Sequence, residues 1–100
     1  MLKEFAPYKR LVLVCTNVKN DETKPCCGRK DGEAIFTNIR EEIRSKNLSD
    51  VVRVSKTGCL GKCVNGPNII VYPDGIWYSE VRLEDIKDII GDITLGFEER

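Results

Sequence analysis

The cysteines are the residues of this 100-residue chain whose type and spacing could support chemistry. Cys59 and Cys63 stand four positions apart in a segment, 57–67, that also contains three glycines and a proline. Glycine lets the backbone pass close to a bulky group and leaves amide N–H groups free to point at it. Two thiols in such a loop indicate a metal or metal–sulfur site, although two small apolar side chains that fill a turn would leave the same pattern.

Three further cysteines, Cys15, Cys26 and Cys27, strengthen the metal interpretation. The chain has five cysteines and no histidine, which removes the commonest general base and the usual nitrogen ligand of zinc. Four thiolates can hold tetrahedral zinc or an iron–sulfur cluster and would leave one cysteine over. Glycine N–H groups and cations beside the loops favour an anionic iron–sulfur cluster, because both stabilise negative charge. The flanking basic residues are Lys24, Arg29, Lys30, Lys56 and Lys62.

Charge and hydropathy argue against several classes of partner. Sixteen basic and sixteen acidic side chains cancel, so the net charge favours neither nucleic acid nor an anionic membrane. The longest apolar runs, 11–15 and 69–72, are too short to cross a bilayer, and the N-terminal segment lacks the apolar core of a signal peptide. We therefore expect a single domain over residues 1–100, located in the cytoplasm, where reducing conditions leave thiols available to metal.

The first part of the chain predicts where three of the cysteines lie. Residues 11–15 are a short apolar run, typical of a strand buried on both faces, and the run ends at Cys15. Residues 16–30 are polar and have no period, which predicts a long loop with Cys26 and Cys27 near its end.

The next two elements should bring the remaining cysteines to the same place. Apolar residues recur at helical spacing over about 31–47, and the short apolar run at 51–55 predicts a second strand that leads to Cys59. Two strands of one sheet joined by a crossover helix are parallel, so their carboxyl ends meet at one edge. We therefore expect Cys15 and the loop of Cys59 to lie together at that edge.

The rest of the chain completes the predicted fold. Two apolar strands at 68–72 and 76–79 flank a Pro-Asp-Gly turn, and a last helix is expected over about 83–90, with Gly91 as its end. The order β-α-β-β-β-α predicts an α/β fold of the thioredoxin-like type: a four-stranded mixed sheet in the order 2-1-3-4 with two main helices.

Taken together, the cysteine blocks and the long run that follows them resemble the thioredoxin-like [2Fe–2S] ferredoxins. The matching blocks are Val-Cys-Thr-Asn at 14–17, Cys-Cys-Gly-Arg-Lys at 26–30, Thr-Gly-Cys-Leu-Gly-Lys-Cys at 57–63, and the segment 66–78. The resemblance runs from about residue 11 to 90. It implies a one-electron carrier rather than an enzyme, often homodimeric, which exchanges electrons with redox partner proteins through a [2Fe–2S] cluster close to the surface.

The resemblance also implies the ligands. The family's cluster ligands fall on Cys15, Cys27, Cys59 and Cys63. Counting back from the helix that carries Phe36 favours Cys27 over its neighbour Cys26, which remains the alternative ligand. The spacing matches neither the plant-type nor the bacterial ferredoxin pattern, so neither of those folds is implied.

Two other functions are open on the sequence alone. A zinc-stabilised thioredoxin-like interaction module would use the same thiolates. A thiol–disulfide oxidoreductase is less favoured, because the chain lacks a Cys-x-x-Cys at a helix start and the adjacent Cys26 and Cys27 cannot bridge without strain.

Two groups of surface residues have more than one possible role. The basic residues beside the loops could dock an acidic patch on a redox partner or simply be solvated. Tyr72, Trp77 and Tyr78 could form the face of a homodimer, pack under the last helix, or cover the cluster.

Overall fold

A single mixed sheet organises the chain. The computed structural model describes residues 1–17, 31–58, 60–61 and 66–96. Its strands are β1 (Arg10–Cys15), β2 (Val52–Thr57), β3 (Ile69–Tyr72) and β4 (Ile76–Tyr78). They form a sheet in the order β2-β1-β3-β4, in which β1 runs parallel to β2 and β3 runs antiparallel to β1 and β4. The predicted strand order and the mixed pairing are confirmed.

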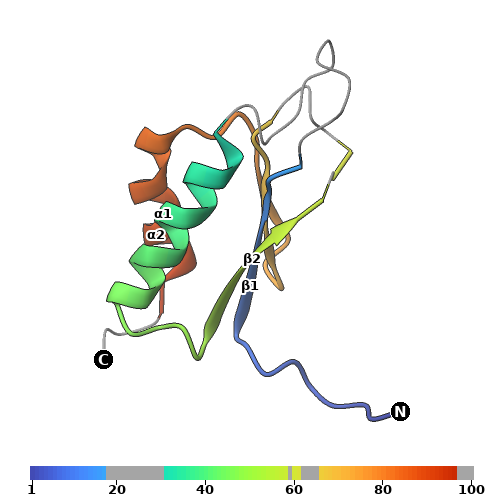
Figure 1. Cartoon of the computed structure of the whole chain (residues 1–100). Helices are drawn as coiled ribbons and strands as arrows, with labels where there is room; N and C mark the ends of the chain where they lie inside the picture. The colour runs from blue at the N-terminus through green and yellow to red at the C-terminus, as the bar shows by residue number, and fades with distance from the viewer. Residues whose placement is uncertain (18–30, 59, 62–65, 97–100) are drawn as a thin grey trace.

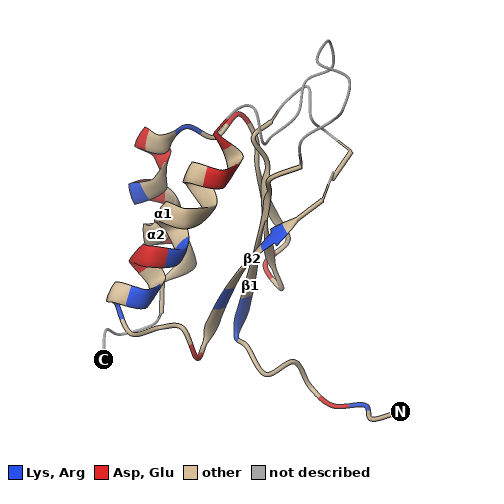
Figure 2. Ribbon diagram, in the orientation of Figure 1, with Lys and Arg blue, Asp and Glu red and all other residues tan. Residues whose placement is uncertain are grey.

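Two helices pack on one face of this sheet (Figure 1). They are α1 (Gly32–Ser45) and α2 (Ile86–Ile93), and a short 3-10 turn, η3 (Leu83–Asp85), leads into α2. Basic and acidic residues are interspersed along both helices (Figure 2). Neither helix, and no other helix in the described part of the chain, is long and apolar enough to span a bilayer.

The predicted end of the last helix was wrong. Gly91 lies inside α2, which continues to Ile93. Ile93 is buried, as are three other isoleucines of α2. Burial of a large aliphatic side chain stabilises by about 2 kcal/mol, which exceeds the cost of about 1 kcal/mol for a glycine in a helix.

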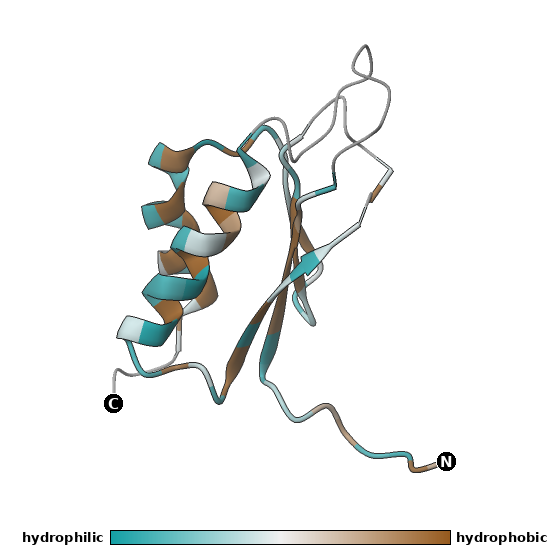
Figure 3. Ribbon diagram, viewed as in Figure 1, coloured by the Kyte–Doolittle hydropathy of each residue, from teal (hydrophilic) through white to brown (hydrophobic). Residues whose placement is uncertain are grey.

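The hydrophobic core lies between the helices and the sheet. Alternate residues of β1, Val12 and Val14, point into it and are completely buried. Ile35, Ile39 and Ile43 of α1 cover them at the three- and four-residue steps that the sequence predicts. Figure 3 shows apolar residues along the strands and alternating with hydrophilic ones on the helices. Among the described elements, no helix packs against the outer face of the sheet, which carries Leu11 and Leu13 of β1 (Figure 1).

Arg10 fastens the start of β1 to the C-terminal part of the fold. Its guanidinium donates hydrogen bonds to the backbone oxygens of Ile93 at 2.9 Å and Leu95 at 3.0 Å. A third bond reaches Asp74 Oδ1 at 3.2 Å, in the predicted Pro-Asp-Gly turn. That turn is closed by Gly75, whose φ is 74° and whose N–H donates to the backbone oxygen of Val71.

Candidate metal-cluster site

Cys15 lies at the end of the central strand, on the face of the sheet that the helices do not cover. Side chains alternate along a strand, so Cys15 points to the same side as Leu11 and Leu13 and away from Val14. Its thiol is free and completely buried, yet it is separate from the main core. The described residue that packs against it is Leu60, which stands in the sequence between Cys59 and Cys63.

Hydrogen bonds around Cys15 bring three segments of the chain to one edge. Cys15 pairs with Thr57 of β2, and the next residue, Thr16, donates its N–H to the backbone oxygen of Thr57 at 3.2 Å. On the other side, the Cys15 N–H donates to the backbone oxygen of Asn68 at 3.1 Å. The segment that contains Cys59 and Cys63 leaves at Thr57 and returns at Asn68. Both of its anchors are therefore bonded to the end of β1: Thr57 through the predicted parallel pairing, and Asn68 on the side of the antiparallel strand β3.

Four of the five predicted site residues have no described position. Cys26, Cys27, Cys59 and Cys63 lie outside the described residues, so the predicted ligand set stays a prediction. Within the described residues, no three His, Cys, Asp or Glu side chains gather into a metal-binding group. The structure places Cys15 and the starting points of the two loops that carry the other cysteines.

Lys56 is the flanking basic residue that the structure describes. Its Nζ lies 3.1 Å from Oε2 of Glu33, in the first turn of α1, and 5.3 Å from the ring centre of Phe36. Both charged side chains are about half exposed. The charge of Lys56 is therefore offset by a carboxylate, and its contribution to a basic docking surface is small. The other four flanking basic residues lie outside the described residues.

Two aromatic residues of the hairpin are exposed and the third packs against the core. Tyr72 is 49% and Trp77 is 38% exposed. Tyr78 instead packs against the core beside α2, as one of the three sequence hypotheses proposed, and its hydroxyl donates to Asp92 Oδ2 at 2.8 Å. Burial, followed by the hydrogen bond and the charge of Asp92, raises the pKa of Tyr78 to about 12.

Sequence reasoning missed the role of Asn68. It is the buried polar residue of the described chain, with 1% of its surface exposed. Its side-chain Oδ1 accepts a hydrogen bond from Trp77 Nε1 at 3.1 Å. The available signal was an asparagine at the start of an apolar strand, directly after the Gly-Pro that ends the second cysteine loop.

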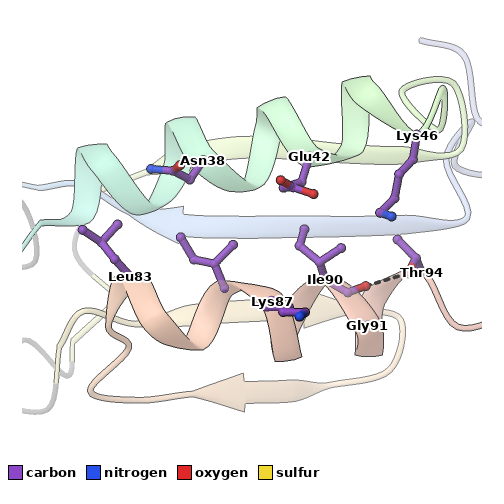
Figure 4. Close-up of a pocket in the computed structure, with 9 residues that line it drawn as sticks. Asn38, Glu42, Lys46, Leu83, Lys87, Ile90, Gly91 and Thr94 are labelled. Carbon is purple, nitrogen blue, oxygen red and sulfur yellow. Dashed lines mark hydrogen bonds between the residues drawn. The ribbon is translucent and has the colours of Figure 1, made fainter.

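A groove between α1 and α2 lies on the helical layer, on the opposite side of the sheet from the Cys15 side chain. Its volume is about 620 Å³ (Figure 4). Charges of both signs, from Glu42, Lys46 and Lys87, surround its apolar base. It contains no cysteine and has no part in the site at the sheet edge.

Known proteins resemble this chain over most of its length. No family model matches the sequence. A protein described as "Ferredoxin, 2Fe-2S" from Clostridium pasteurianum is 37% identical over 83 residues, which are 82% of this chain and 81% of the relative. The chain belongs to the thioredoxin-like [2Fe–2S] ferredoxins. A second 2Fe-2S ferredoxin, from Aquifex aeolicus, is 34% identical over 95 residues, covering 94% of this chain and 86% of the relative.

A solved structure supports the same family. The crystal structure of the wild-type thioredoxin-like [2Fe-2S] ferredoxin from Aquifex aeolicus matches with a TM-score of 0.79 and 28% identity, covering 92% of this chain and 91% of that one. The family resemblance and the thioredoxin-like fold are thereby confirmed. Ferredoxins carry electrons and are not enzymes, in agreement with the function that the resemblance implied.

The donor set of this ferredoxin fits an iron–sulfur cluster. Five thiols without a histidine allow all-cysteine ligation and exclude a site in which imidazoles replace two thiolates. The thiol of Cys15 stands outside the helix-covered core, where it is available to a group held by the adjoining loops.

Proposed function

We propose that this chain is a one-electron carrier whose [2Fe–2S] cluster is held by the thiolates of Cys15, Cys27, Cys59 and Cys63. The observation that carries the proposal is the position of Cys15 between Thr57 and Asn68, the two anchors of the loop that contains Cys59 and Cys63. The packing of Leu60 against Cys15 supports it further, because Leu60 belongs to that loop.

The chain's own residues set the conditions for electron transfer. A bound [2Fe–2S] cluster supplies a one-electron couple, and all-cysteine ligation implies a potential roughly a few hundred millivolts negative. Leu60 and the sheet keep water away from Cys15, and exclusion of water lowers the potential because the reduced state carries more negative charge. The backbone N–H of Cys15 donates to the backbone oxygen of Asn68 and is therefore not available to the cluster. Any N–H groups that offset the charge of the cluster would come from other residues of the loops.

The proposal extends to the surroundings of the cluster. Both cysteine loops leave from the rim of the sheet, which favours a cluster close to the surface, where it can exchange electrons with donor and acceptor proteins. An acidic partner would be attracted by the basic residues beside the loops, namely Lys24, Arg29, Lys30 and Lys62. Lys56 would contribute less, because it is already paired with Glu33. Electron-transfer rates that fall as ionic strength rises would support this docking, and a flat salt dependence would remove it.

We also propose a homodimer in the cytoplasm. Tyr72 and Trp77 are exposed large side chains on the hairpin and could form its face. Sedimentation of the wild type and of Tyr72→Lys tests this: a dimer that the variant converts to a monomer agrees with the proposal, and a wild-type monomer contradicts it. The free thiol of Cys15 agrees with a reducing compartment.

The decisive experiment is a visible absorption spectrum of anaerobically purified protein with iron and sulfide analysis. We expect a red-brown protein with iron and acid-labile sulfide in equal amounts. A colourless protein that contains zinc would identify an interaction module, and a colourless protein without metal would leave a thiol–disulfide enzyme. Either colourless result would overturn the proposed function.

Cysteine variants test the ligand set. Cys15→Ser should abolish or severely weaken cluster binding, because Cys15 is buried at a strand end and no cysteine adjoins it in the sequence. Cys27→Ser should keep a cluster with an altered spectrum, with Cys26 as the replacement ligand, and Cys26→Ser serves as the matched control with an unchanged spectrum. Complete loss of iron and sulfide from Cys27→Ser would contradict the replacement.

A further inference from the structure

Asn68 connects the candidate ligand Cys15 to the outer surface of the sheet. Register pairs Val14 with Ile69, so Asn68 stands directly across from Cys15. Directly opposed residues of antiparallel strands place their side chains next to each other on one face. The backbone hydrogen bond from Cys15 to Asn68, at 3.1 Å, fixes this juxtaposition.

Trp77 covers Asn68 from the neighbouring strand. It pairs with Ile70, two residues beyond Asn68, and therefore lies diagonally across the outer face from it. The indole N–H reaches back to Asn68 Oδ1 at 3.1 Å. Asn68 is 1% exposed whereas Trp77 is 38% exposed. Trp77 is thus the outer member of a row that runs inward through Asn68 to Cys15.

The hydrogen bond between Trp77 and Asn68 stabilises the arrangement of these side chains beside Cys15. A buried amide oxygen that loses its hydrogen bond keeps its full desolvation penalty, so the bond from the indole N–H favours the observed orientation of the Asn68 side chain. In the described chain, no buried side-chain nitrogen or oxygen atom is without a hydrogen-bond partner. Loss of the indole N–H would leave the buried Oδ1 of Asn68 without this hydrogen bond and would favour entry of water beside Cys15.

We propose that Trp77 and Asn68 act as positioning residues that hold Cys15 and exclude water from its thiolate, and thereby lower the reduction potential of the cluster. The inference rests on the proposed function, since it presumes that Cys15 is a ligand. Water beside a ligand sulfur stabilises the more negative, reduced state, so disruption of the pair raises the potential.

The chain's single tryptophan allows a one-atom test. Expression in a tryptophan auxotroph with benzothienylalanine replaces the indole N–H by sulfur at Trp77 alone and keeps the shape of the side chain. Asn68→Leu removes the acceptor, and Tyr72→Phe is the matched control because it alters an exposed aromatic side chain of the same sheet. Iron and sulfide are measured first. A wild-type protein that assembles no cluster refutes the proposed function, and this result is distinct from a failure of the present inference.

The reduction potential of each cluster-loaded protein is then measured by spectroelectrochemical titration. We expect the benzothienyl protein and Asn68→Leu each to shift the ratio of reduced to oxidised protein at fixed potential at least threefold toward the reduced form, or about 28 mV at 59 mV per tenfold change. The protein that combines both changes should shift no further than the larger single effect, because one hydrogen bond is lost in each case. The Tyr72→Phe potential should equal that of the wild type.

A second measurement follows the hydrogen bond itself. The Trp77 emission of Asn68→Leu should move to longer wavelength than that of the wild type, since the indole N–H then donates to water. Potentials of the benzothienyl protein within the spread of the Tyr72→Phe control would overturn the inference, as would shifts that add in the combined protein. The benzothienyl protein decides the question alone if Asn68→Leu fails to fold, because its shape is unchanged.

Discussion

Replacement of Arg10 by methionine should destabilise the fold without changing the cluster. Methionine keeps an unbranched apolar stem, so the change mainly removes the three hydrogen bonds of the guanidinium. The bond to the Ile93 carbonyl is partly buried and involves a charged donor, which is worth about 1.5 kcal/mol. The exposed bonds to Leu95 and Asp74 add about 0.5 kcal/mol each, because solvent screens them.

The expected loss is therefore about 2–3 kcal/mol. For a domain of this size that corresponds to a fall of roughly 10–20 °C in Tm. The assay is circular dichroism of the cluster-loaded protein at one fixed heating rate, because a protein with a bound cofactor departs from two-state unfolding and an irreversible transition depends on the scan rate. Visible absorption recorded in the same samples reports the cluster.

Asp74→Asn is the matched control, because it removes only the exposed ion pair. It should lower Tm by a quarter or less of the Arg10→Met effect, and its effect should shrink as salt is added. The reduction potential of Arg10→Met should equal that of the wild type, because Arg10 begins β1 and Cys15 ends it. A Tm for Arg10→Met no lower than that of Asp74→Asn would refute the assigned role of the helix-end carbonyls.

Three further predictions concern Tyr78, Ile39 and Leu60. The pKa of Tyr78 rises from 10.0 to about 12 through burial and the bond to Asp92. Its contribution to the free energy of unfolding is therefore complete below pH 10 and is lost as the pH rises toward 12. In denaturant titrations, Tyr78→Phe should lack this loss of stability between pH 10 and 12. Ile39→Ala, at a completely buried position of α1, should cost about 3–4 kcal/mol in the same titrations, and a loss below 1 kcal/mol would contradict the core packing. Leu60→Ala should speed the loss of visible absorbance to an iron chelator several-fold, since it uncovers Cys15, and an unchanged rate would contradict that shielding.

Much of the fold could be predicted because its signals are local. The short apolar run of β1 and the helical period of α1 each depend on residues within one element. The hairpin of β3 and β4 follows from the Pro-Asp-Gly turn, whose glycine takes a positive φ. The crossover rule then leaves few ways to order the strands, so the sheet order is also accessible from sequence.

The features that sequence reasoning missed depend on contacts between distant residues or on a balance between two opposing effects. The bonds from Arg10 to the backbone oxygens of Ile93 and Leu95 join residues more than eighty positions apart, and no pattern of composition encodes such a pair. The extension of α2 past Gly91 depends on how deeply Ile93 is buried against the sheet. The start of α1 has two features that the helical spacing does not predict: Asp31 takes φ 71° without a side-chain cap, and Glu33 pairs with Lys56.

The candidate site was predictable only in outline. Parallel pairing alone brings Cys15 and the start of the second cysteine loop to one edge, and the structure agrees. The choice between Cys26 and Cys27 depends on loop geometry outside the described residues. The link from Cys15 through Asn68 to Trp77 could not be seen in the sequence, because it depends on strand register across three strands.

The central place of β1 has a consequence for the order of folding. Both strands that pair with β1 come much later in the sequence, so its contacts close long loops and form slowly. The neighbours of Cys15 on both sides, Thr57 and Asn68, arrive only when this non-local pairing reaches the last residue of the strand. Iron and sulfide are therefore expected to enter a chain whose sheet has already formed, and maturation of the carrier should wait on the completion of its scaffold.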